Sequence, residues 1–214
     1  DAAPIMGQYF DVLAIRTFPS LKDREADYSE FILQQFIKYA GIPVISLESA
    51  TLHPLQSLSD LITIKENITA SFNELRKPKI VLTWAPHVKP LPQCVANSFA
   101  QWVNAWGEAE FVITHPKGYE LHTDYTKGAS IVHDQEDALK NADFIIGNSS
   151  AGIREAPYYG IPTVNIGNRQ LNRATSSKII NTSSEKSKIL EAFKKLSRKC
   201  DPPAAVQLRV ANCG

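Results

Sequence analysis

Short, nearly uninterrupted runs of apolar residues alternate along this chain with segments of helical periodicity. Two of these runs, IVLTW (80–84) and DFIIG (143–147), show no regular alternation of polar and apolar side chains. Such a strand is typically buried on both faces, as in a parallel sheet that helices cover on either side. The sequence therefore predicts an α/β fold with a doubly wound parallel sheet of Rossmann type.

The same patterns place the individual elements. Strands are predicted, from Val- and Ile-rich runs, over 12–17, 44–47, 80–84, 110–114, 130–133, 143–146, 163–166 and 178–181. Helices are predicted, from apolar residues at helical spacing, over 28–39, 55–68, 98–106 and 184–199. We expect the second part of the chain to form a sheet of order 3-2-1-4-5-6, with 80–84 as strand 1 and 143–146 as strand 4.

A polar stretch around residue 75 divides the chain into two predicted domains. Residues 1–75 contain only two predicted strands, too few for an independent core, and are interpreted as a truncated α/β half-domain that lacks its first half. Residues 76–199 form the predicted Rossmann-like domain. Residues 200–214 fit no periodic pattern and are predicted to be a loosely attached tail.

Composition narrows the class of partner. The formal net charge of +1 gives no reason to expect a nucleic acid or a membrane surface. No apolar run approaches the roughly 18–20 residues that a membrane span needs. The first residues lack the basic and apolar regions of a secretion signal. We therefore expect a cytoplasmic protein whose ligand is a small molecule.

The cysteines and histidines do not form a metal-binding pattern. Cys94, Cys200 and Cys213 include no closely spaced pair, so reduced thiols are favoured, and a Cys200–Cys213 disulfide is the alternative. Four histidines fall in the second predicted domain: His87, His115, His122 and His133. Their spacings match no ligand motif, and they are interpreted as solvated histidines near strand ends. No metal and no other cofactor is predicted.

Three segments in the first two thirds of the chain carry a more specific pattern. They are VLAIRTF (12–18), SLESATLHPLQSLSDLITIKE (46–66) and VLTWAPHVKPLPQCVANSFAQWVNA (81–105). Together they resemble the aspartate/ornithine carbamoyltransferase superfamily, most closely the branch that acts on N-succinyl- or N-acetyl-ornithine. The resemblance extends from residue 1 to about residue 142. HPLQ alone is a weak signal, but its combination with DLITI and the proline-rich TWAPHVKPLPQ is specific.

The resemblance implies which residues carry the chemistry. Carbamoyl transfer needs hydrogen-bond donors on the carbonyl oxygen and cations on the phosphate. Arg16 and His53 are implied to point at carbamoyl phosphate, and Gln56 to hold the carbamoyl amide. There are plainer interpretations, in which His53 caps the following helix and Gln56 lies on the exposed first turn of that helix.

The resemblance also implies an amino-acid side of the site. Glu48 is implied to shape this side of the cleft, and Asn97 to meet the backbone groups of the amino acid. The loop from Pro86 to Gln93, which includes Pro90, is implied to receive the N-acyl group.

Two elements of the family pattern are absent from the chain. They are the phosphate-binding SxRTR turn and the HCLP segment near the reacting centre. Charge-assisted hydrogen bonds contribute about 1.5–3 kcal/mol each, so their loss weakens the binding of carbamoyl phosphate. We therefore expect the isolated chain to lack full transferase activity, and its status as an enzyme stays open.

A second signature begins at Phe144 with FIIGNSSAGIREAPYYGIPTVNIGNRQLNR (144–173). It resembles the nucleotide half of the UDP-N-acetylglucosamine 2-epimerases, especially the hydrolysing kind with a two-domain GT-B-like fold. The resemblance covers about residues 143–198. The chain is therefore interpreted as a chimera with a junction near Asp143.

This second signature is a candidate nucleotide site. Ser149, Ser150 and Gly152 lie in a turn where small residues let the N–H groups at a helix start approach an anion. Glu155 is implied to accept hydrogen bonds from a ribose, and Arg169 could neutralise a phosphate. Alternatively, one of the serines only caps the helix and Gly152 permits close packing. The acids and bases that epimerisation needs have no candidates in residues 1–142.

Three hypotheses for the function follow. The chain is a carbamoyltransferase-like protein that binds carbamoyl phosphate or an N-acyl-ornithine, a UDP-sugar-binding module, or a folded chimera without catalysis. In the predicted sheet the loops after strands 1 and 4 lie at the same edge, so Asn97 and Ser149 are predicted to face one crevice. The resemblance to the carbamoyltransferases implies a trimer whose subunits meet largely through the first domain. Because that domain is interpreted as truncated here, the oligomeric state stays open.

Overall fold

The computed structural model describes residues 2–68, 77–83, 92–139, 142–147, 153–154, 156–158, 160–168, 170, 172–183, 185–197 and 205–208. The chain forms two compact units. Unit 1 comprises residues 1–64, 86–102 and 121–126, and unit 2 comprises residues 65–85, 103–120 and 127–214. The chain thus passes from unit 1 to unit 2 after residue 64, before the boundary expected at about residue 75. Residues 86–102 and 121–126 then belong to unit 1 again.

Unit 1 is built on two parallel strands, β1 and β2. Its elements are α1 (Ala2–Met6), β1 (Leu13–Arg16), α2 (Arg24–Tyr28), α3 (Phe31–Tyr39), β2 (Val44–Glu48), most of α4 (Pro54–Ile68), the first part of α5 (Cys94–Trp106) and α6 (Thr123–Thr126). A small core of Ala3, Leu13 and Ala40 joins α1 to β1 and to the end of α3. Both strands contain isoleucine, and β2 also contains valine, β-branched residues that favour extended chain.

The helix predicted over 28–39 is observed as α3, which begins at Phe31, while Tyr28 ends the shorter helix α2, which the sequence did not predict. Asp23 caps α2, since its carboxylate accepts hydrogen bonds from the backbone N–H groups of Glu25 and Ala26. Glu30 interrupts the helical path with a φ of 48°. Its side chain accepts hydrogen bonds from the backbone nitrogen and the hydroxyl of Thr51, at 3.0 and 2.7 Å. A tertiary contact thus holds Glu30 in this conformation between α2 and α3.

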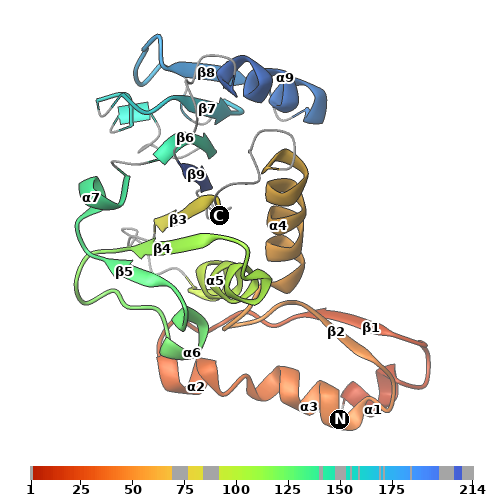
Figure 1. The fold of residues 1–214 in the computed structure, drawn as a ribbon. Coiled ribbons are helices and arrows are strands. Elements are labelled where there is room, and N and C mark those ends of the chain that lie inside the picture. Colours follow the sequence, from red (N-terminus) through yellow and green to blue (C-terminus); the bar gives the residue numbers. More distant parts are fainter. Residues whose placement is uncertain are drawn as a thin grey trace. The chain divides into compact units, whose positions relative to one another are not determined.

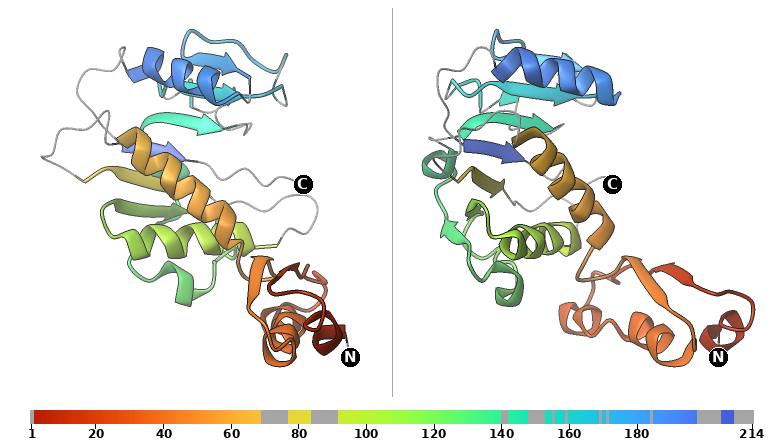
Figure 2. Two further views of the ribbon diagram at one scale, coloured as in Figure 1. Left: turned by 90° about the vertical axis from the view of Figure 1, so that its right-hand side faces the viewer. Right: turned by 45° about the vertical axis from the view of Figure 1, so that its right-hand side comes forward.

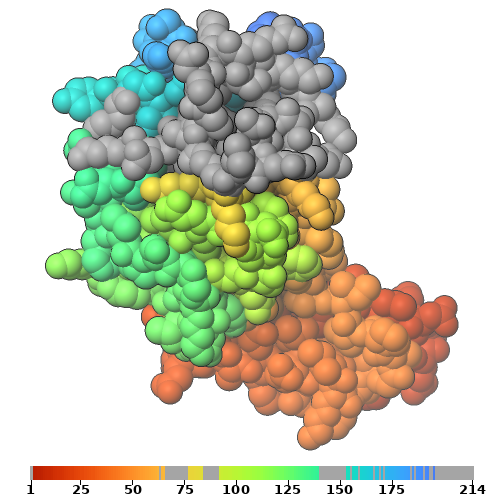
Figure 3. All heavy atoms as spheres, in the orientation of Figure 1, coloured from red at the N-terminus to blue at the C-terminus, as the bar shows by residue number. Residues whose placement is uncertain are grey.

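Unit 1 exposes several large apolar side chains. Phe31 is 67% exposed although it belongs to the apolar spacing that predicted the helix, and Tyr9 and Phe18 are also exposed. The red and orange atoms in Figure 3 show the surface formed by this part of the chain.

Unit 2 contains a parallel sheet of order β5-β4-β3-β9-β6-β7-β8 (Figure 1). The strands are β3 (Lys79–Thr83), β4 (Glu110–Thr114), β5 (Ser130–Val132), β6 (Ala142–Gly147), β7 (Thr163–Ile166), β8 (Ile179–Thr182) and β9 (Ala205–Leu208). The two described helices that lie wholly in unit 2 are α7 (Gln135–Leu139) and α9 (Lys186–Ser197). Helix α9 packs beside β7 and β8 (Figure 2). The predicted α/β class with parallel strands is confirmed.

The core of unit 2 explains why its strands read as uninterrupted apolar runs. Val81 of β3 and Val112 of β4 are buried in one cluster with Leu139 of α7, Ala156 and Ile161. Ile80 and Leu82, which alternate with Val81 along β3, are also buried. Both faces of this strand are therefore covered, as the sequence predicted.

The order of the sheet differs from the prediction at one position. Strands 3-2-1 correspond to β5-β4-β3 and strands 4-5-6 to β6-β7-β8, but β9 lies between β3 and β6. Val206 pairs with Ile80 on one side and with Phe144 on the other. The expectation of a loosely attached tail is thus wrong for residues 205–208. A strand of four residues gives little signal in the sequence. Its position is defined by the two strands beside it, which no local pattern specifies.

None of the helices in the described part of the chain combines the length and the apolar character that a membrane crossing requires.

The central position of β9 leads to a stability prediction. Proline has no N–H group to donate to a neighbouring strand, so Val206→Pro should leave a buried carbonyl unpaired. We expect the free energy of unfolding of unit 2 to fall by about 1–3 kcal/mol in urea denaturation, the usual cost of such a group. Val206→Ala keeps the N–H group and serves as the control. Equal stability of the two variants would contradict the central placement of β9.

Candidate functional site

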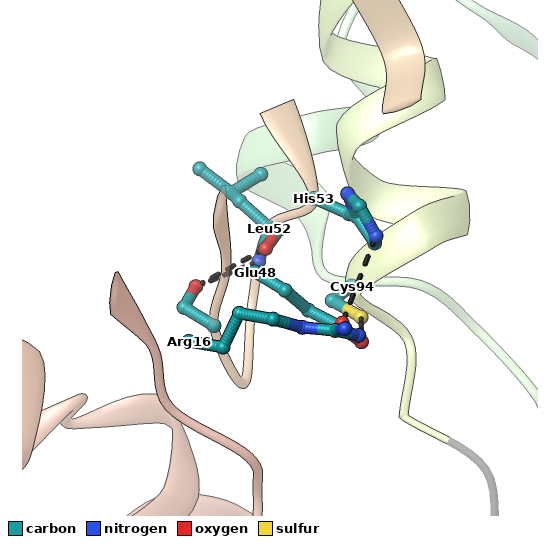
Figure 4. Close-up of polar contacts among 6 residues, drawn as sticks. Arg16, Glu48, Leu52, His53 and Cys94 are labelled. Carbon is teal, nitrogen blue, oxygen red and sulfur yellow. Dashed lines mark hydrogen bonds and ion pairs between the residues drawn. The ribbon is translucent and has the colours of Figure 1, made fainter. Parts of the chain in front are cut away.

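Arg16 and Glu48 meet because the pairing of β1 and β2 is irregular. The register shifts after Ile15, and Leu47 is skipped, so that Arg16 pairs with Glu48. Successive side chains of a strand point to opposite faces, and a shift of one residue therefore brings Glu48 to the face that carries Arg16. A guanidinium nitrogen, Nη2 of Arg16, donates to Oε2 of Glu48 (Figure 4).

His53 reaches the same carboxylate through a tight turn after β2. The backbone nitrogen of Ser49 donates to the carbonyl of Leu52 at 2.8 Å, and the nitrogen of Leu52 donates to the hydroxyl of Ser49 at 3.1 Å. Beyond this turn, Nε2 of His53 lies 3.6 Å from Oε2 of Glu48 (Figure 4). Arg16 and His53 thus converge on a single oxygen atom.

The backbone of His53 also starts helix α4. Its carbonyl accepts a hydrogen bond from the nitrogen of Ser57 at 3.3 Å, and Pro54 occupies the first helical position. Proline suits that position because its fixed φ is compatible with a helix. A backbone N–H group at the first helical position would also have no acceptor within the helix, so its absence costs nothing. The helix-start interpretation of His53 therefore describes its backbone, whereas its ring faces Glu48.

Helix α5 supplies the third contact to this carboxylate. The thiol of Cys94, the first residue of α5, donates to Oε1 of Glu48 at 3.8 Å. Burial and, secondarily, the charge of Glu48 raise the pKa of the Cys94 thiol to about 12. The thiol therefore stays protonated at neutral pH and acts as a neutral donor. We call Arg16, Glu48, His53 and Cys94 the carboxylate cluster.

A second hydrogen-bond network fixes Asn97, one turn further along α5. Its amide nitrogen donates to the hydroxyl of Tyr28 at 3.0 Å and to the carbonyl of Thr51 at 3.2 Å. The Tyr28 hydroxyl in turn donates to Oε1 of Gln93 at 2.6 Å. Residues three apart on a helix share a face, which places Cys94 and Asn97 on the same side of α5.

The remaining polar atom of Asn97, Oδ1, has no partner among the residues that the structure describes. The side chain is fully buried, and Oδ1 accepts no hydrogen bond from the described residues. A buried amide oxygen without a donor is costly, so it marks a place where a ligand or a water molecule can donate. Because both amide hydrogens are already used, Asn97 can offer only an acceptor.

Gln56 and Asp60 form a separate pair on α4. The amide nitrogen of Gln56 donates to Oδ1 of Asp60 at 2.9 Å, which orients the exposed Gln56 side chain. Oδ2 of Asp60 is buried and has no partner among the described residues. Burial raises the pKa of the Asp60 carboxyl, while the hydrogen bond from Gln56 and the charge of His53 oppose that shift.

The structure brings some of the predicted site residues together in unit 1. Arg16, Glu48 and His53 are in contact, Asn97 lies one turn from Cys94 of the same cluster, and Gln56 pairs with Asp60. The predicted residues outside the described part of the chain are Pro90, Ser149, Ser150, Gly152, Glu155 and Arg169. The predicted approach of Asn97 to Ser149 therefore stays a prediction.

The sequence did not single out Cys94, Tyr28 or Asp60 for the site. The four-residue spacing between Gln56 and Asp60 is the signal that could have found that pair, because such residues are neighbours on a helix. Tyr28 carries no comparable signal, since its partners Gln93 and Asn97 are far from it in the sequence.

The histidines differ from the prediction in one respect. His115 was expected to be solvated but is only 4% exposed, because it follows β4 in the interior of the sheet. Its ring contacts that of His133 edge-on, with 5.1 Å between the centroids. His87 lies outside the described residues. Within the described ranges, no group of three or more His, Cys, Asp or Glu residues is arranged to hold a metal ion.

The fold is that of a transcarbamylase-type α/β protein. A crystal structure of N-acetyl-L-ornithine transcarbamylase superposes with a TM-score of 0.61 at 22% identity, over 92% of this chain and 69% of the other. A structure of a mutant of that enzyme, complexed with carbamyl phosphate and N-succinyl-L-norvaline, gives a TM-score of 0.61 at 23% identity, over 92% of this chain and 70% of the other.

Sequence comparison adds two relationships. The N-succinylornithine carbamoyltransferase of Bacteroides thetaiotaomicron is 50% identical over 151 residues, which are 71% of this chain and 46% of the relative. The UDP-N-acetylglucosamine 2-epimerase of Neisseria meningitidis serogroup B is 53% identical over 55 residues, 26% of this chain and 15% of that enzyme. The chain spans about half the length of the carbamoyltransferases that it matches.

Two family profiles divide the chain unevenly. The profile of the aspartate/ornithine carbamoyltransferase carbamoyl-P binding domain matches residues 1–66, and that of UDP-N-acetylglucosamine 2-epimerase matches residues 47–210. The chain thus belongs to the UDP-N-acetylglucosamine 2-epimerase family over residues 47–210 and is a homologue of the N-acyl-ornithine carbamoyltransferases over most of its length. The epimerase match begins well before the predicted junction near residue 143.

The state of the Cys94 thiol can be tested by alkylation. With a pKa of about 12 only about one thiol in ten thousand is ionised at pH 8, and the side chain is also buried. We expect iodoacetamide to modify Cys94 only after unfolding in guanidinium chloride, as read by mass spectrometry of the Cys94 peptide. Modification in the folded protein at the rate of an exposed cysteine would contradict this environment.

Asp60 should make stability depend on pH. Because burial raises its folded-state pKa above 3.8, the unfolded chain loses the proton first as the pH rises. This group therefore lowers the free energy of unfolding as the pH rises from about 3.8 through the folded-state pKa. Urea denaturation between pH 3.5 and 7 should show Asp60→Asn gaining stability relative to the unmodified chain across that window. A constant difference between the two proteins would contradict the shift.

Proposed function

We propose that unit 1 binds the carbamoyl donor and the amino-acid acceptor of an N-acyl-ornithine carbamoyltransferase reaction. The convergence of Arg16 and His53 on one oxygen of Glu48 is the observation that carries this proposal. A guanidinium and an imidazole that meet at one acceptor form the donor set that a phosphate or a developing oxyanion needs. The 50% identity to an N-succinylornithine carbamoyltransferase supports this choice of reaction.

The chemistry assigns a role to each group. The amine of the acceptor attacks the carbamoyl carbon, the bond to phosphate breaks, and negative charge develops on the carbonyl oxygen. Arg16 and His53 are proposed to donate to carbamoyl phosphate, including that oxygen. Gln56 is proposed to bind the carbamoyl amide. Its nitrogen is held by Asp60, which leaves its carbonyl oxygen as the acceptor for the N–H groups of a carbamoyl amide.

Asn97 is the proposed contact to the amino-acid substrate. Its unpartnered Oδ1 accepts, and the acylated α-nitrogen of an N-acyl-ornithine carries an N–H group that can donate to it. Glu48 is proposed to border this part of the site. The proposed role of Pro90 in receiving the N-acyl group rests on the sequence resemblance alone.

Arg16 provides the direct test. Replacing it with alanine removes a charge-assisted donor, typically about 1.5–3 kcal/mol, which corresponds to a loss of affinity of about 10- to 100-fold. We expect carbamoyl phosphate to raise the melting temperature of the unmodified chain and to have a much weaker effect on Arg16→Ala. Differential scanning fluorimetry across a carbamoyl phosphate titration measures both.

The matched control is Lys22→Ala. Lys22 lies in the same unit, is exposed and carries the same charge, and its backbone nitrogen is the part that contacts Ser20. It should respond to carbamoyl phosphate as the unmodified chain does. Equal responses of all three proteins would contradict a role for Arg16, and the absence of any response would contradict the proposed function.

A second candidate function is a UDP-sugar-binding module. The epimerase profile over residues 47–210 and the 53% identity over 55 residues favour it. Its proposed contacts, Ser149, Ser150, Gly152, Glu155 and Arg169, rest on sequence. Stabilisation of the chain by UDP or UDP-N-acetylglucosamine, but not by carbamoyl phosphate or N-succinyl-ornithine, would favour this function. No response to any of these ligands would favour a folded chimera without catalysis.

A further inference from the structure

We propose that the Glu48 carboxylate occupies the anion position of the site, so that an anionic ligand binds by displacing it from Arg16 and His53. This inference rests on the proposed anion-binding role of Arg16 and His53, and it adds that the Glu48 carboxylate competes with the ligand for them. Glu48 then lowers the affinity of the site for an anionic ligand.

The imidazole of His53 carries the first step of the argument. Its Nδ1 is buried and has no partner among the described residues, and it is not the atom that lies beside Arg16 and Glu48. The other nitrogen, Nε2, faces Glu48 at 3.6 Å. An anion that binds Arg16 and His53 together must therefore take Nε2, the atom that now faces Oε2 of Glu48, and the two acceptors compete for it.

Differences in exposure carry the second step. The side chains of Arg16 and His53 are 52% and 24% exposed, whereas that of Glu48 is 10% exposed. Arg16 and His53 are thus more exposed to solvent than the carboxylate on which they converge (Figure 4). A dissolved anion can reach the guanidinium directly, and a doubly charged one attracts it more strongly than a single carboxylate does.

Cys94 explains how Glu48 can release Arg16 and His53 without losing every hydrogen-bond donor. Its thiol donates to Oε1, the oxygen that Arg16 and His53 do not use. Burial keeps this thiol protonated, since the pKa is raised to about 12. After an anion takes Arg16 and His53, the buried carboxylate still has one hydrogen-bond donor, which lowers the cost of the exchange.

The effect of removing Glu48 tests the proposal. Sulfate is a suitable probe because it stays a dianion from pH 6 to 8, and inorganic phosphate is the second probe. Isothermal titration calorimetry at constant ionic strength should show Glu48→Gln and Glu48→Ala binding both probes about tenfold more tightly than the unmodified chain, since a competing charge-assisted contact has been removed. Circular dichroism establishes that the variants are folded.

Glu25→Gln is the matched control. It removes one negative charge from an exposed position of unit 1, in the first turn of α2. An unchanged affinity in this variant assigns the gain to the Glu48 contacts, whereas an equal gain in Glu25→Gln would assign it to net charge and overturn the proposal.

Other outcomes separate the inference from the proposed function. Weaker or unchanged sulfate affinity in Glu48→Gln would show that Glu48 holds Arg16 and His53 in place. That result would overturn the inference but would leave the anion site intact. No binding of either probe by any of these proteins would overturn the anion site itself.

A measurement on the unmodified chain covers the case in which the variants do not fold. The ¹³C carboxylate resonance of Glu48 should move as sulfate saturates the site, because the carboxylate loses two donors. Sulfate binding that leaves this resonance in place would overturn the displacement.

Discussion

The carboxylate of Glu48 holds together the described part of unit 1. It receives Arg16 from β1, His53 from the turn before α4 and Cys94 from α5, and so joins the segment from β2 to α4 with two segments that are distant in the sequence. A carboxylate that is largely withdrawn from water is costly unless donors surround it. The positions of the strand pair, the turn and the helix are therefore mutually dependent.

The sheet of unit 2 shows why one chain can match two enzyme families. Both families resembled here use parallel βαβ units, in which each strand satisfies its neighbours through backbone hydrogen bonds that do not depend on side-chain identity. What such a strand requires is apolar cover on both faces, and the buried residues of β3, β4 and β7 meet that requirement. Segments that resemble two different families are thus compatible within one parallel sheet.

Prediction from sequence succeeded where a local pattern decides the structure. The ends of each predicted strand agree with the described strands to within one residue, because apolar runs between turn residues define both. It was wrong where a distant contact decides. Glu30, which accepts hydrogen bonds from Thr51, precedes the start of α3 at Phe31, His115 is buried by the strands on either side of β4, and residues 205–208 form a strand between two others. None of these contacts has a signature within a short window.

The candidate site divides in the same way. The sequence by itself determined the α/β class, because burial on both faces of a strand shows in uninterrupted apolar runs, and its resemblance to the carbamoyltransferases singled out Arg16, His53 and Asn97 as candidates. Only the tertiary structure decided what these side chains contact. The skipped residue between β1 and β2 turns Glu48 toward Arg16, and α5 brings Cys94 to the same carboxylate. Such contacts depend on strand register and helix packing, which no single segment of the sequence specifies.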